Sequence, residues 1–155
     1  MQHPVTTSPG YSERLWPSWP TWLIAPGLGL GTALSVLPVG VTPSLVAAAV
    51  VTAAVVAGLV AASPVVRVAD GELWAGRAHV PVGLLGEPVA ADGEEARLER
   101  GPRLDARAYL CIRGWVRPVV RVPLRDPADP TPYWLLSTRR PAALVDAVRA
   151  ARQPG

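Results

Sequence analysis

One long stretch of the chain carries no charged side chain. The 52 residues between Arg14 and Arg67 contain no Asp, Glu, Lys or Arg. The hydrocarbon core of a bilayer is about 30 Å thick, and a helix needs about 20 apolar residues to cross it. A run of this length is too long for one crossing and predicts two, joined by a short turn near residues 38–44. We expect the first transmembrane helix over about residues 21–37 and the second over about residues 44–62.

A soluble protein with two buried helices is the main alternative. The 91 residues that follow Pro64 are too few to cover two apolar helices on all sides. A cleaved secretory signal does not explain the run either, because its apolar region is only about 7–15 residues long. The sequence therefore predicts an integral membrane protein, with the lipid bilayer as its first partner.

The remaining composition argues against several classes of function. The net charge of +3 comes from 15 basic residues, all arginines, and 12 acids, and this surplus is too small for a nucleic-acid-binding surface. One cysteine, Cys111, and two distant histidines, His3 and His79, offer no metal-ligand spacing. No paired carboxylates and no nucleophile motif stand out. We expect no nucleic acid, no metal, no other cofactor and no enzyme activity.

The charges that flank the uncharged run predict the topology. The turn at 38–44 has no positive charge, whereas Arg14 precedes the first helix and Arg67 and Arg77 follow the second. Positively charged flanks stay in the cytoplasm. We expect a multi-pass protein of the cell membrane with both termini cytoplasmic.

Small residues predict how the two helices touch. Gly27 and Gly31 form a G-x-x-x-G pattern on the first helix, and Ala49, Ala53 and Ala57 repeat at the same spacing on the second. Faces of this kind let two helices approach closely in a membrane. The alternative is that these residues only reflect an Ala- and Gly-rich composition. Ala25, Gly29 and Ala33 continue the small-residue surface of the first helix.

Three regions follow from these patterns. We expect a cytoplasmic N-terminal segment over residues 1–20, with a belt of tryptophans, the two transmembrane helices within residues 21–63, and a cytoplasmic domain over residues 64–155. In the last region alternating apolar residues predict six or seven short strands. An amphipathic helix follows from Pro141, with Leu144 and Val148 on its apolar stripe. The fold class is α+β, with an antiparallel β domain similar to a pleckstrin-homology-like barrel closed by the C-terminal helix.

The two longest predicted strands suggest a basic stripe. If residues 108–113 and 117–125 form a hairpin around Gly114-Trp115-Val116, their even-numbered apolar residues face the core. The other face then carries four arginines: Arg113, Arg117, Arg121 and Arg125. Such a stripe suits anionic lipid headgroups or an acidic protein partner. The alternative is a solvated sheet face whose arginines pair with acids of the same domain.

Four motifs resemble those of one known family. They are Tyr11-Ser12-Glu13-Arg14-Leu15-Trp16, Asp70-Gly71-Glu72-Leu73, Arg113-Gly114-Trp115-Val116-Arg117, and the longest, which runs from Asp129 to Pro141. The chain resembles, over roughly residues 11–152, the domain-of-unknown-function 3093 family of actinobacterial membrane proteins. The resemblance implies two membrane helices and a cytoplasmic domain. That family has no assigned activity, so no catalytic residues carry over.

Three hypotheses about function remain, in this order. The first is a membrane-anchored, non-enzymatic interaction module. The second is an accessory or regulatory subunit that contacts a larger membrane complex through its helical hairpin. The third is an enzyme of a type that these motifs do not identify.

Overall fold

The computed structural model describes residues 10–153. The chain divides into two compact units. The helical hairpin comprises Trp16–Ser63. The other unit is assembled from the segment that ends at Leu15 and the segment that begins at Pro64, and we call it the split domain.

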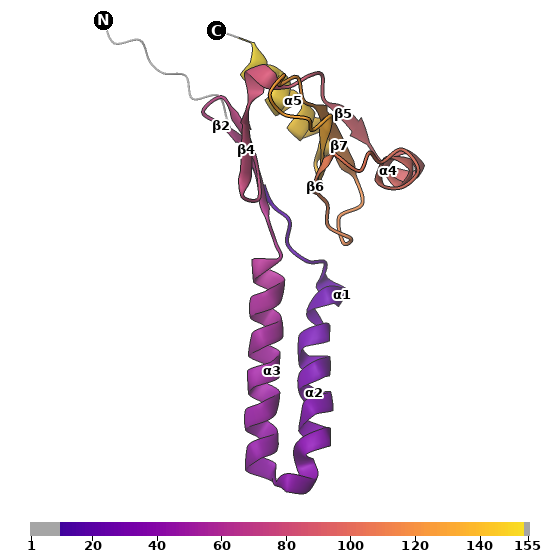
Figure 1. The fold of residues 1–155 in the computed structure, drawn as a ribbon. Helices are drawn as coiled ribbons and strands as arrows, with labels where there is room; N and C mark the ends of the chain where they lie inside the picture. Colours follow the sequence, from indigo (N-terminus) through magenta and orange to yellow (C-terminus); the bar gives the residue numbers. More distant parts are fainter. Residues whose placement is uncertain (1–9, 154–155) are drawn as a thin grey trace, which may run out of the picture. The chain divides into compact units, whose positions relative to one another are not determined.

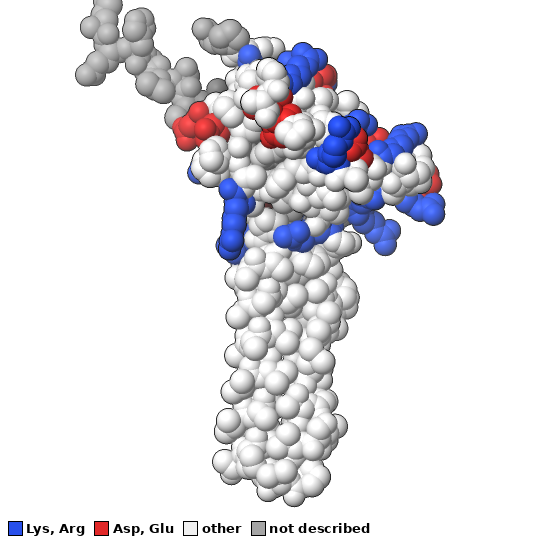
Figure 2. Space-filling view, viewed as in Figure 1, with Lys and Arg blue, Asp and Glu red and all other residues white. Residues whose placement is uncertain are grey.

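The helical hairpin consists of two long helical segments that run alongside each other (Figure 1). Its elements are α1 (Trp19–Trp22), α2 (Ile24–Val36), η1 (Leu37–Val39) and α3 (Val41–Ala61). Both Trp19–Val39 and Val41–Ala61 are 21 residues long and apolar enough to cross a membrane, with mean hydropathies of 1.6 and 2.4. The core helix of a soluble protein is mostly buried, whereas only 11% and 6% of these two spans are buried inside the molecule. Figure 2 shows no charged side chain over the hairpin on the face drawn.

The helix α3 begins three residues before the expected residue 44. Pro43 lies in its first turn, where the missing N–H costs no intrahelical hydrogen bond. Gly40 precedes the helix with a φ of 146°, a conformation that favours glycine. The proline that marks the turn in the sequence therefore belongs to the helix that follows it.

The contact between α2 and α3 runs through Gly29 and not through the G-x-x-x-G pair. A Cβ atom on Gly29 would collide with the Thr52 hydroxyl and lie 3.2 Å from the Ala48 carbonyl oxygen. Around Gly27 and Gly31, by contrast, a Cβ would meet nothing within 4 Å. Residues two positions apart on a helix point to nearly opposite sides at 3.6 residues per turn, so Gly29 can face α3 only if Gly27 and Gly31 face away.

The alanines predicted on α3 are also displaced from the contact. Ala49, Ala53 and Ala57 are exposed, because the face of α3 that meets α2 passes through Ala48 and Thr52. That face lies one residue, or about 100°, away from the predicted one. The prediction of close packing through small residues therefore holds for Gly29 and is wrong for Gly27, Gly31 and these three alanines.

The first sheet of the split domain joins segments from both sides of the hairpin. Its order is β1-β2-β3-β4, with all neighbours antiparallel. The strands are β1 (Tyr11–Arg14), β2 (Val65–Ala69), β3 (Glu72–Ala75) and β4 (Ala78–Pro81). Arg14 is paired in register with Val65, across the whole inserted hairpin. Residues 11–14 are therefore part of the split domain and not of a separate N-terminal segment; residues 1–9 of that predicted segment lie outside the described residues.

The second sheet has the order β5-β7-β8-β6. Its strands are β5 (Val89–Ala91), β6 (Tyr109–Cys111), β7 (Val119–Pro123) and β8 (Tyr133–Ser137). The neighbours are antiparallel except β6 and β8, which are parallel. The α+β class and the antiparallel strands are as predicted. The barrel is not, because the strands form two separate four-stranded sheets that do not close.

The predicted hairpin between β6 and β7 does not form. Every residue of β8 is buried, and a strand that is buried on both sides belongs in the middle of a sheet, where both faces are covered. It lies between β7 and β6 and so separates them. The expectation that the even-numbered residues of β6 face the core is also reversed. Cys111 belongs to the core, whereas Leu110 is 45% exposed.

The core of the split domain has two layers. The larger cluster fills the space among the inner face of the first sheet, one face of the second sheet and α5 (Pro141–Arg152). The smaller cluster lies on the opposite face of the second sheet, where Ala96 of α4 (Gly93–Arg100) covers Val119 and Leu135. Leu144 and Val148 of α5 are both fully buried, which confirms the predicted apolar stripe of the C-terminal helix.

Candidate functional site

A buried carboxylate lies on the strand that precedes the hairpin. Because side chains alternate along β1, Tyr11 and Glu13 point into the domain while Ser12 and Arg14 point outward. Glu13 is only 9% exposed. A carboxylate removed from water is costly unless hydrogen bonds and charges compensate it, so its partners decide what it does.

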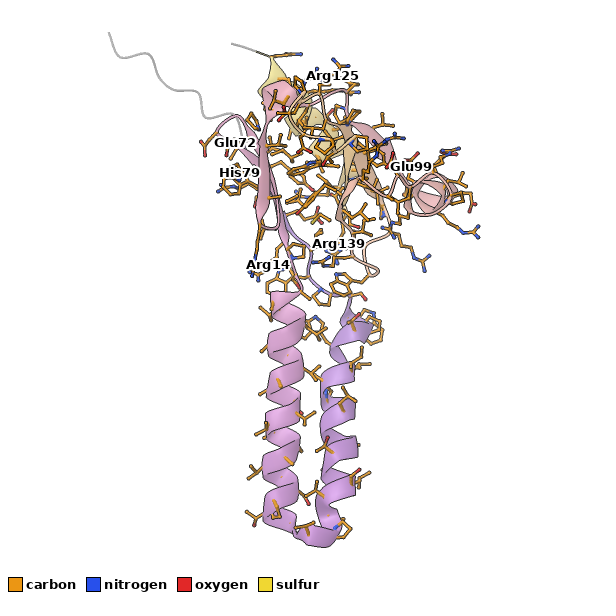
Figure 3. All side chains as sticks on the ribbon, in the orientation of Figure 1. Arg14, Glu72, His79, Glu99, Arg125 and Arg139 are labelled. Carbon is orange, nitrogen blue, oxygen red and sulfur yellow. The ribbon has the colours of Figure 1, made fainter. Side chains whose placement is uncertain are left out.

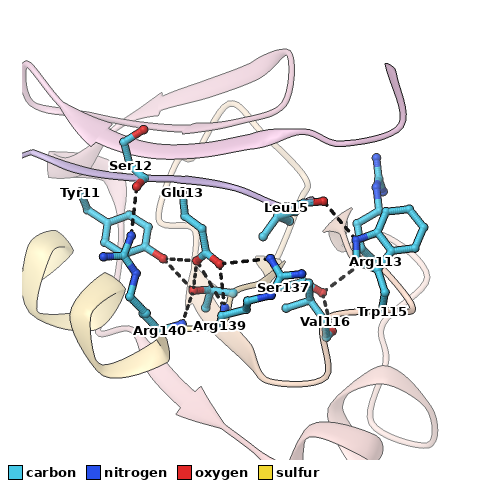
Figure 4. A network of polar contacts seen from close by, with 11 residues as sticks. Tyr11, Ser12, Glu13, Leu15, Arg113, Trp115, Val116, Ser137, Arg139 and Arg140 are labelled. Carbon is cyan, nitrogen blue, oxygen red and sulfur yellow. Dashed lines mark hydrogen bonds and ion pairs between the residues drawn. The ribbon is translucent and has the colours of Figure 1, made fainter. Parts of the chain in front are cut away.

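Tyr11 of β1 and residues at the junction of β8 and α5 supply those partners (Figure 4). The hydroxyl groups of Tyr11 and Thr138 donate to Glu13 Oε2 at 2.5 and 2.6 Å. The backbone N–H of Arg139 donates to Oε1 at 3.1 Å, and the Arg139 guanidinium lies 3.8 Å from the same oxygen. We call Tyr11, Glu13, Thr138 and Arg139 the Glu13 network.

These contacts set the ionisation of the network. Burial by itself would raise the pKa of Glu13, but the hydrogen bonds from Thr138, Tyr11 and Arg139 and the charge of Arg139 together hold that pKa below its usual value. Burial, followed by the hydrogen bond to Glu13, raises the pKa of Tyr11 to about 12. Glu13 is therefore an ionised acceptor at neutral pH and Tyr11 a neutral donor.

A second set of hydrogen bonds ties the same region to the loop before β7. The Arg113 backbone N–H donates to Ser137 Oγ at 3.0 Å, and the Ser137 hydroxyl donates to the Val116 carbonyl at 3.3 Å. The indole N–H of Trp115 donates to the Leu15 carbonyl at 3.1 Å. The bonds of Leu15 to Trp115 and of Glu13 to Thr138 hold residues 11–15 against parts of the chain that lie 100 and 125 positions away.

The arrangement stabilises the fold rather than offering a reactive group. Both oxygens of Glu13 already accept hydrogen bonds from the chain itself, and its lowered pKa makes it a weak base. The network fastens β1, the strand before the hairpin, to the end of β8. Three of the motifs that carry the family resemblance, around Glu13, Trp115 and Thr138, meet here.

The four arginines of the predicted stripe do not share one face. Arg121 points toward α4, where its guanidinium lies 3.4 Å from Glu99 and 4.0 Å from the centre of the Tyr133 ring. Arg113 belongs to the loop after β6, and its guanidinium donates to the Ile112 carbonyl. Arg117 and Arg125 are exposed outside the strands. The stripe depended on a β6–β7 hairpin, and without that pairing the arginines are dispersed.

A hollow of about 280 Å³ lies beside Arg121. It is lined by β5, by Pro123 and by the carboxylates of Glu95 and Glu99 on α4. Glu99 is already paired with Arg121 and with Arg103, at 3.4 and 3.5 Å. The hollow therefore presents charges that the domain itself neutralises.

Metal-ligand and thiol chemistry find no support among residues 10–153. No group of three or more His, Cys, Asp or Glu side chains in this part of the chain could hold a metal ion. Cys111 is buried in the core, and burial raises the pKa of its thiol. A raised pKa leaves less of the reactive thiolate at neutral pH.

Sequence reasoning did not identify the Glu13 network. Residues 11–15 precede a helix of membrane-spanning length and resemble a short tail, so their alternation of Tyr11, Glu13 and Leu15 does not stand out as a strand. The available signal is the alternation itself. Glu13 lies between Tyr11 and Leu15 at the spacing of inward positions on a strand, and both of these neighbours are buried in the core.

The fold defines a class of protein: a helical hairpin of membrane-spanning length inserted between the first two strands of an α+β domain. Residues 10–148 match the family described as protein of unknown function DUF3093, and the chain belongs to this family. The match covers both units of the structure and confirms the family indicated by the motifs. No curated protein and no solved structure matches the chain.

Proposed function

We propose that the protein crosses the cell membrane twice and presents the split domain at the cytoplasmic face as a non-enzymatic interaction module. The length and apolar character of Trp19–Val39 and Val41–Ala61 support two crossings. Large side chains on these spans, such as Leu30 at 63% and Leu34 at 62% exposure, have no protein cover within the described chain. Lipid is the environment that would cover them.

The pairing of β1 with β2 carries the proposal. One strand enters the hairpin and the other leaves it, and Arg14 and Val65 are directly opposite each other in the sheet. A chain that crosses a membrane twice returns to the side from which it started. The pairing of β1 with β2 likewise requires both ends of the hairpin to lie on the same side. Arg14, Arg67 and Arg77 make cytoplasm the favoured side under the positive-inside rule.

An interaction module agrees better with the split domain than an enzyme does. Its most elaborate polar site, the Glu13 network, consists of groups that satisfy one another. Its ion pairs, including Arg149 and Arg152 with Glu87, lie mostly on the surface. What the domain offers to other molecules is therefore its exterior.

Reporter fusions test this proposal. We expect a reporter at Val41 to be active outside the cytoplasm and reporters at the N-terminus and the C-terminus to be active inside it. Resistance of the full chain to alkaline carbonate extraction from membranes is the matching biochemical result. A reporter at the C-terminus that is active outside, or release of the chain by carbonate, contradicts the proposal.

One observation favours the hypothesis of an accessory subunit. Gly27 and Gly31 leave the outward side of α2 smooth, and Ala53 and Ala57 do the same for α3. Another membrane helix could pack there at short range. Replacing Gly27 and Gly31 by Leu should then abolish co-purification of a membrane complex, whereas the same pair of changes leaves an interaction made by the split domain intact.

A further inference from the structure

The first sheet carries opposite charges at its two ends. The Gly76 N–H donates to the Val65 carbonyl at 2.9 Å, so the β3–β4 turn, with Arg77, lies at the end where Arg14 is paired with Val65. The β2–β3 turn, with Asp70, forms the other end, next to Glu72. Figure 3 shows Arg14 and Glu72 at opposite ends of this sheet, with His79 between them.

Arg67 extends this positive charge along the outer face. Ser12, Arg67, Trp74 and His79 form one row across the four strands. The Arg67 guanidinium carbon lies 5.5 Å from the centre of the Trp74 ring, and the His79 ring stacks on Trp74 at 4.3 Å. The row therefore combines an arginine with an indole, two side chains that suit the boundary between water and lipid.

Arg67 and Arg77 keep their charge available to another molecule. Both are exposed. Within residues 10–153 no ion pair joins either of them to a carboxylate. Arg121, in contrast, is paired with Glu99. Two unneutralised arginines, Arg77 at one end of the sheet and Arg67 midway along it, attract an anionic surface.

The covalent chain keeps this end near the membrane. Only residues 62–64 separate α3 from β2, and three extended residues span about 10 Å. If α3 is inserted, the end of the first sheet that contains Val65 stays within a short tether of the headgroup layer. The reach of this tether is comparable to the screening length, about 8 Å at physiological salt, over which an anionic leaflet attracts positive charge.

We propose that Arg14 and Arg77, which form the basic end of the first sheet, and Arg67 on its outer face bind anionic lipid headgroups of the cytoplasmic leaflet. This inference rests on the proposed two-pass insertion and adds a ligand class to it. The hairpin already holds the chain in the membrane, so the contact orients the split domain instead of anchoring it. The acidic end, with Asp70 and Glu72, is repelled by the same leaflet and reinforces the orientation.

Lipid retention by the full chain tests the proposal. The protein is reconstituted in nanodiscs of equimolar phosphatidylglycerol and phosphatidylcholine, extracted into mild detergent, and the lipids that stay bound are counted by native mass spectrometry. We expect the wild type to enrich the anionic lipid, and the enrichment to fall by about fivefold for each arginine removed near the surface. The test variant is Arg67→Gln/Arg77→Gln.

Two further variants make the outcome specific. Arg117→Gln/Arg125→Gln removes the same charge from exposed positions elsewhere in the split domain and should retain the enrichment, as should the charge-conserving Arg67→Lys/Arg77→Lys. Salt at 1 M, which shortens the screening length to about 3 Å, should abolish it. Unchanged near-ultraviolet circular dichroism shows that each variant is folded.

The results separate this proposal from the one on which it rests. If the Val41 reporter is outside but the wild type shows no lipid preference, or both glutamine variants lose it equally, the lipid contact is overturned and two-pass insertion stands. An acidic protein surface then becomes the alternative occupant of the basic end. If the Val41 reporter is not outside, both proposals are overturned.

Discussion

The helical hairpin contains no charged residue, whereas all 15 arginines and 12 acids of the chain lie in the segments on either side of it. The two units are also held together differently. The hairpin leaves Leu30 and Leu34 more than 60% exposed, and its helices meet where Gly29 permits close approach. The split domain buries Leu135 and Leu144 completely and adds an ionised network around Glu13.

This difference agrees with a different solvent for each unit, water for the split domain and, under the proposed insertion, lipid for the hairpin. In water, apolar burial drives folding, and a truncated core side chain loses stability. In lipid, apolar side chains gain little by leaving their surroundings, and helices associate through close packing at small residues. Shortening a buried side chain should therefore destabilise the split domain, whereas a larger side chain at the contact between α2 and α3 should destabilise the hairpin.

The largest expected effect is a truncation in the split-domain core. Leu144→Ala should lower the free energy of unfolding of the split domain by about 2–5 kcal/mol, because Leu144 is fully buried. Denaturant unfolding of the full chain in detergent, followed by near-ultraviolet circular dichroism, measures the change. Leu110→Ala is the matched control, since Leu110 is 45% exposed. Equal losses for both variants would show that α5 is not docked as described.

The next effect concerns the buried carboxylate and depends on pH. Glu13→Gln should cost about 1.5–3 kcal/mol at neutral pH, the range for hydrogen bonds to a charged group. Since folding lowers the pKa of Glu13 from 4.5, its contribution is complete above that pH and is lost as the pH falls toward the folded-state value. The difference in stability between wild type and Glu13→Gln should therefore shrink below pH 4.5. A difference that stays constant down to pH 3 would contradict an ionised Glu13.

A smaller effect is expected from enlargement in the hairpin. Gly29→Val should weaken the contact between α2 and α3 by about 1–3 kcal/mol, because its Cβ meets Thr52 and Ala48. Gly31→Val is the control, with nothing within 4 Å of its Cβ. Distance measurements between spin labels on the two helices in nanodiscs should show separation only for the first variant. Separation in Gly31→Val and not in Gly29→Val would instead support a contact through the G-x-x-x-G pattern.

The smallest effects separate two arginines of the predicted stripe. Arg121→Ala should destabilise the split domain by about 1 kcal/mol, because it loses the Glu99 ion pair and the Tyr133 contact. Arg117→Ala should change stability by less than about 0.5 kcal/mol, as expected for an exposed position away from such contacts. Thermal unfolding of both variants measures the difference, and identical values would mean that the pairing of Arg121 contributes nothing.

Features with a strong local signal were predictable from the sequence. The uncharged run predicted two helices of membrane-spanning length, and the helical period around Leu144 and Val148 predicted the docked face of α5. These patterns depend only on residues that lie near one another in the chain. The family, too, follows from short motifs.

Features that depend on distant partners were not predictable in the same way. The alternation in β7 correctly directs Val120 and Val122 to the core, but it does not say that β8, and not β6, lies beside that strand. The small-residue pattern of α2 offers two opposite faces, and only the position of Thr52 on α3 selects Gly29. Glu13 reads as a solvent-facing acid until Thr138 and Arg139, about 125 residues later, are placed beside it.

The central claim is that the strands before and after the hairpin are neighbours in one sheet. Ser12 and Arg67 are directly opposite each other in β1 and β2, and such residues have Cα atoms about 4.5–5.5 Å apart, within the range that a disulfide bridges. Oxidation of membranes that contain the Ser12→Cys/Arg67→Cys variant should therefore cross-link the pair rapidly. Ser12→Cys/His79→Cys, in the same row but three strands apart at about 4.8 Å per strand, should not cross-link. Absence of the first cross-link, or equal formation of both, would contradict the account.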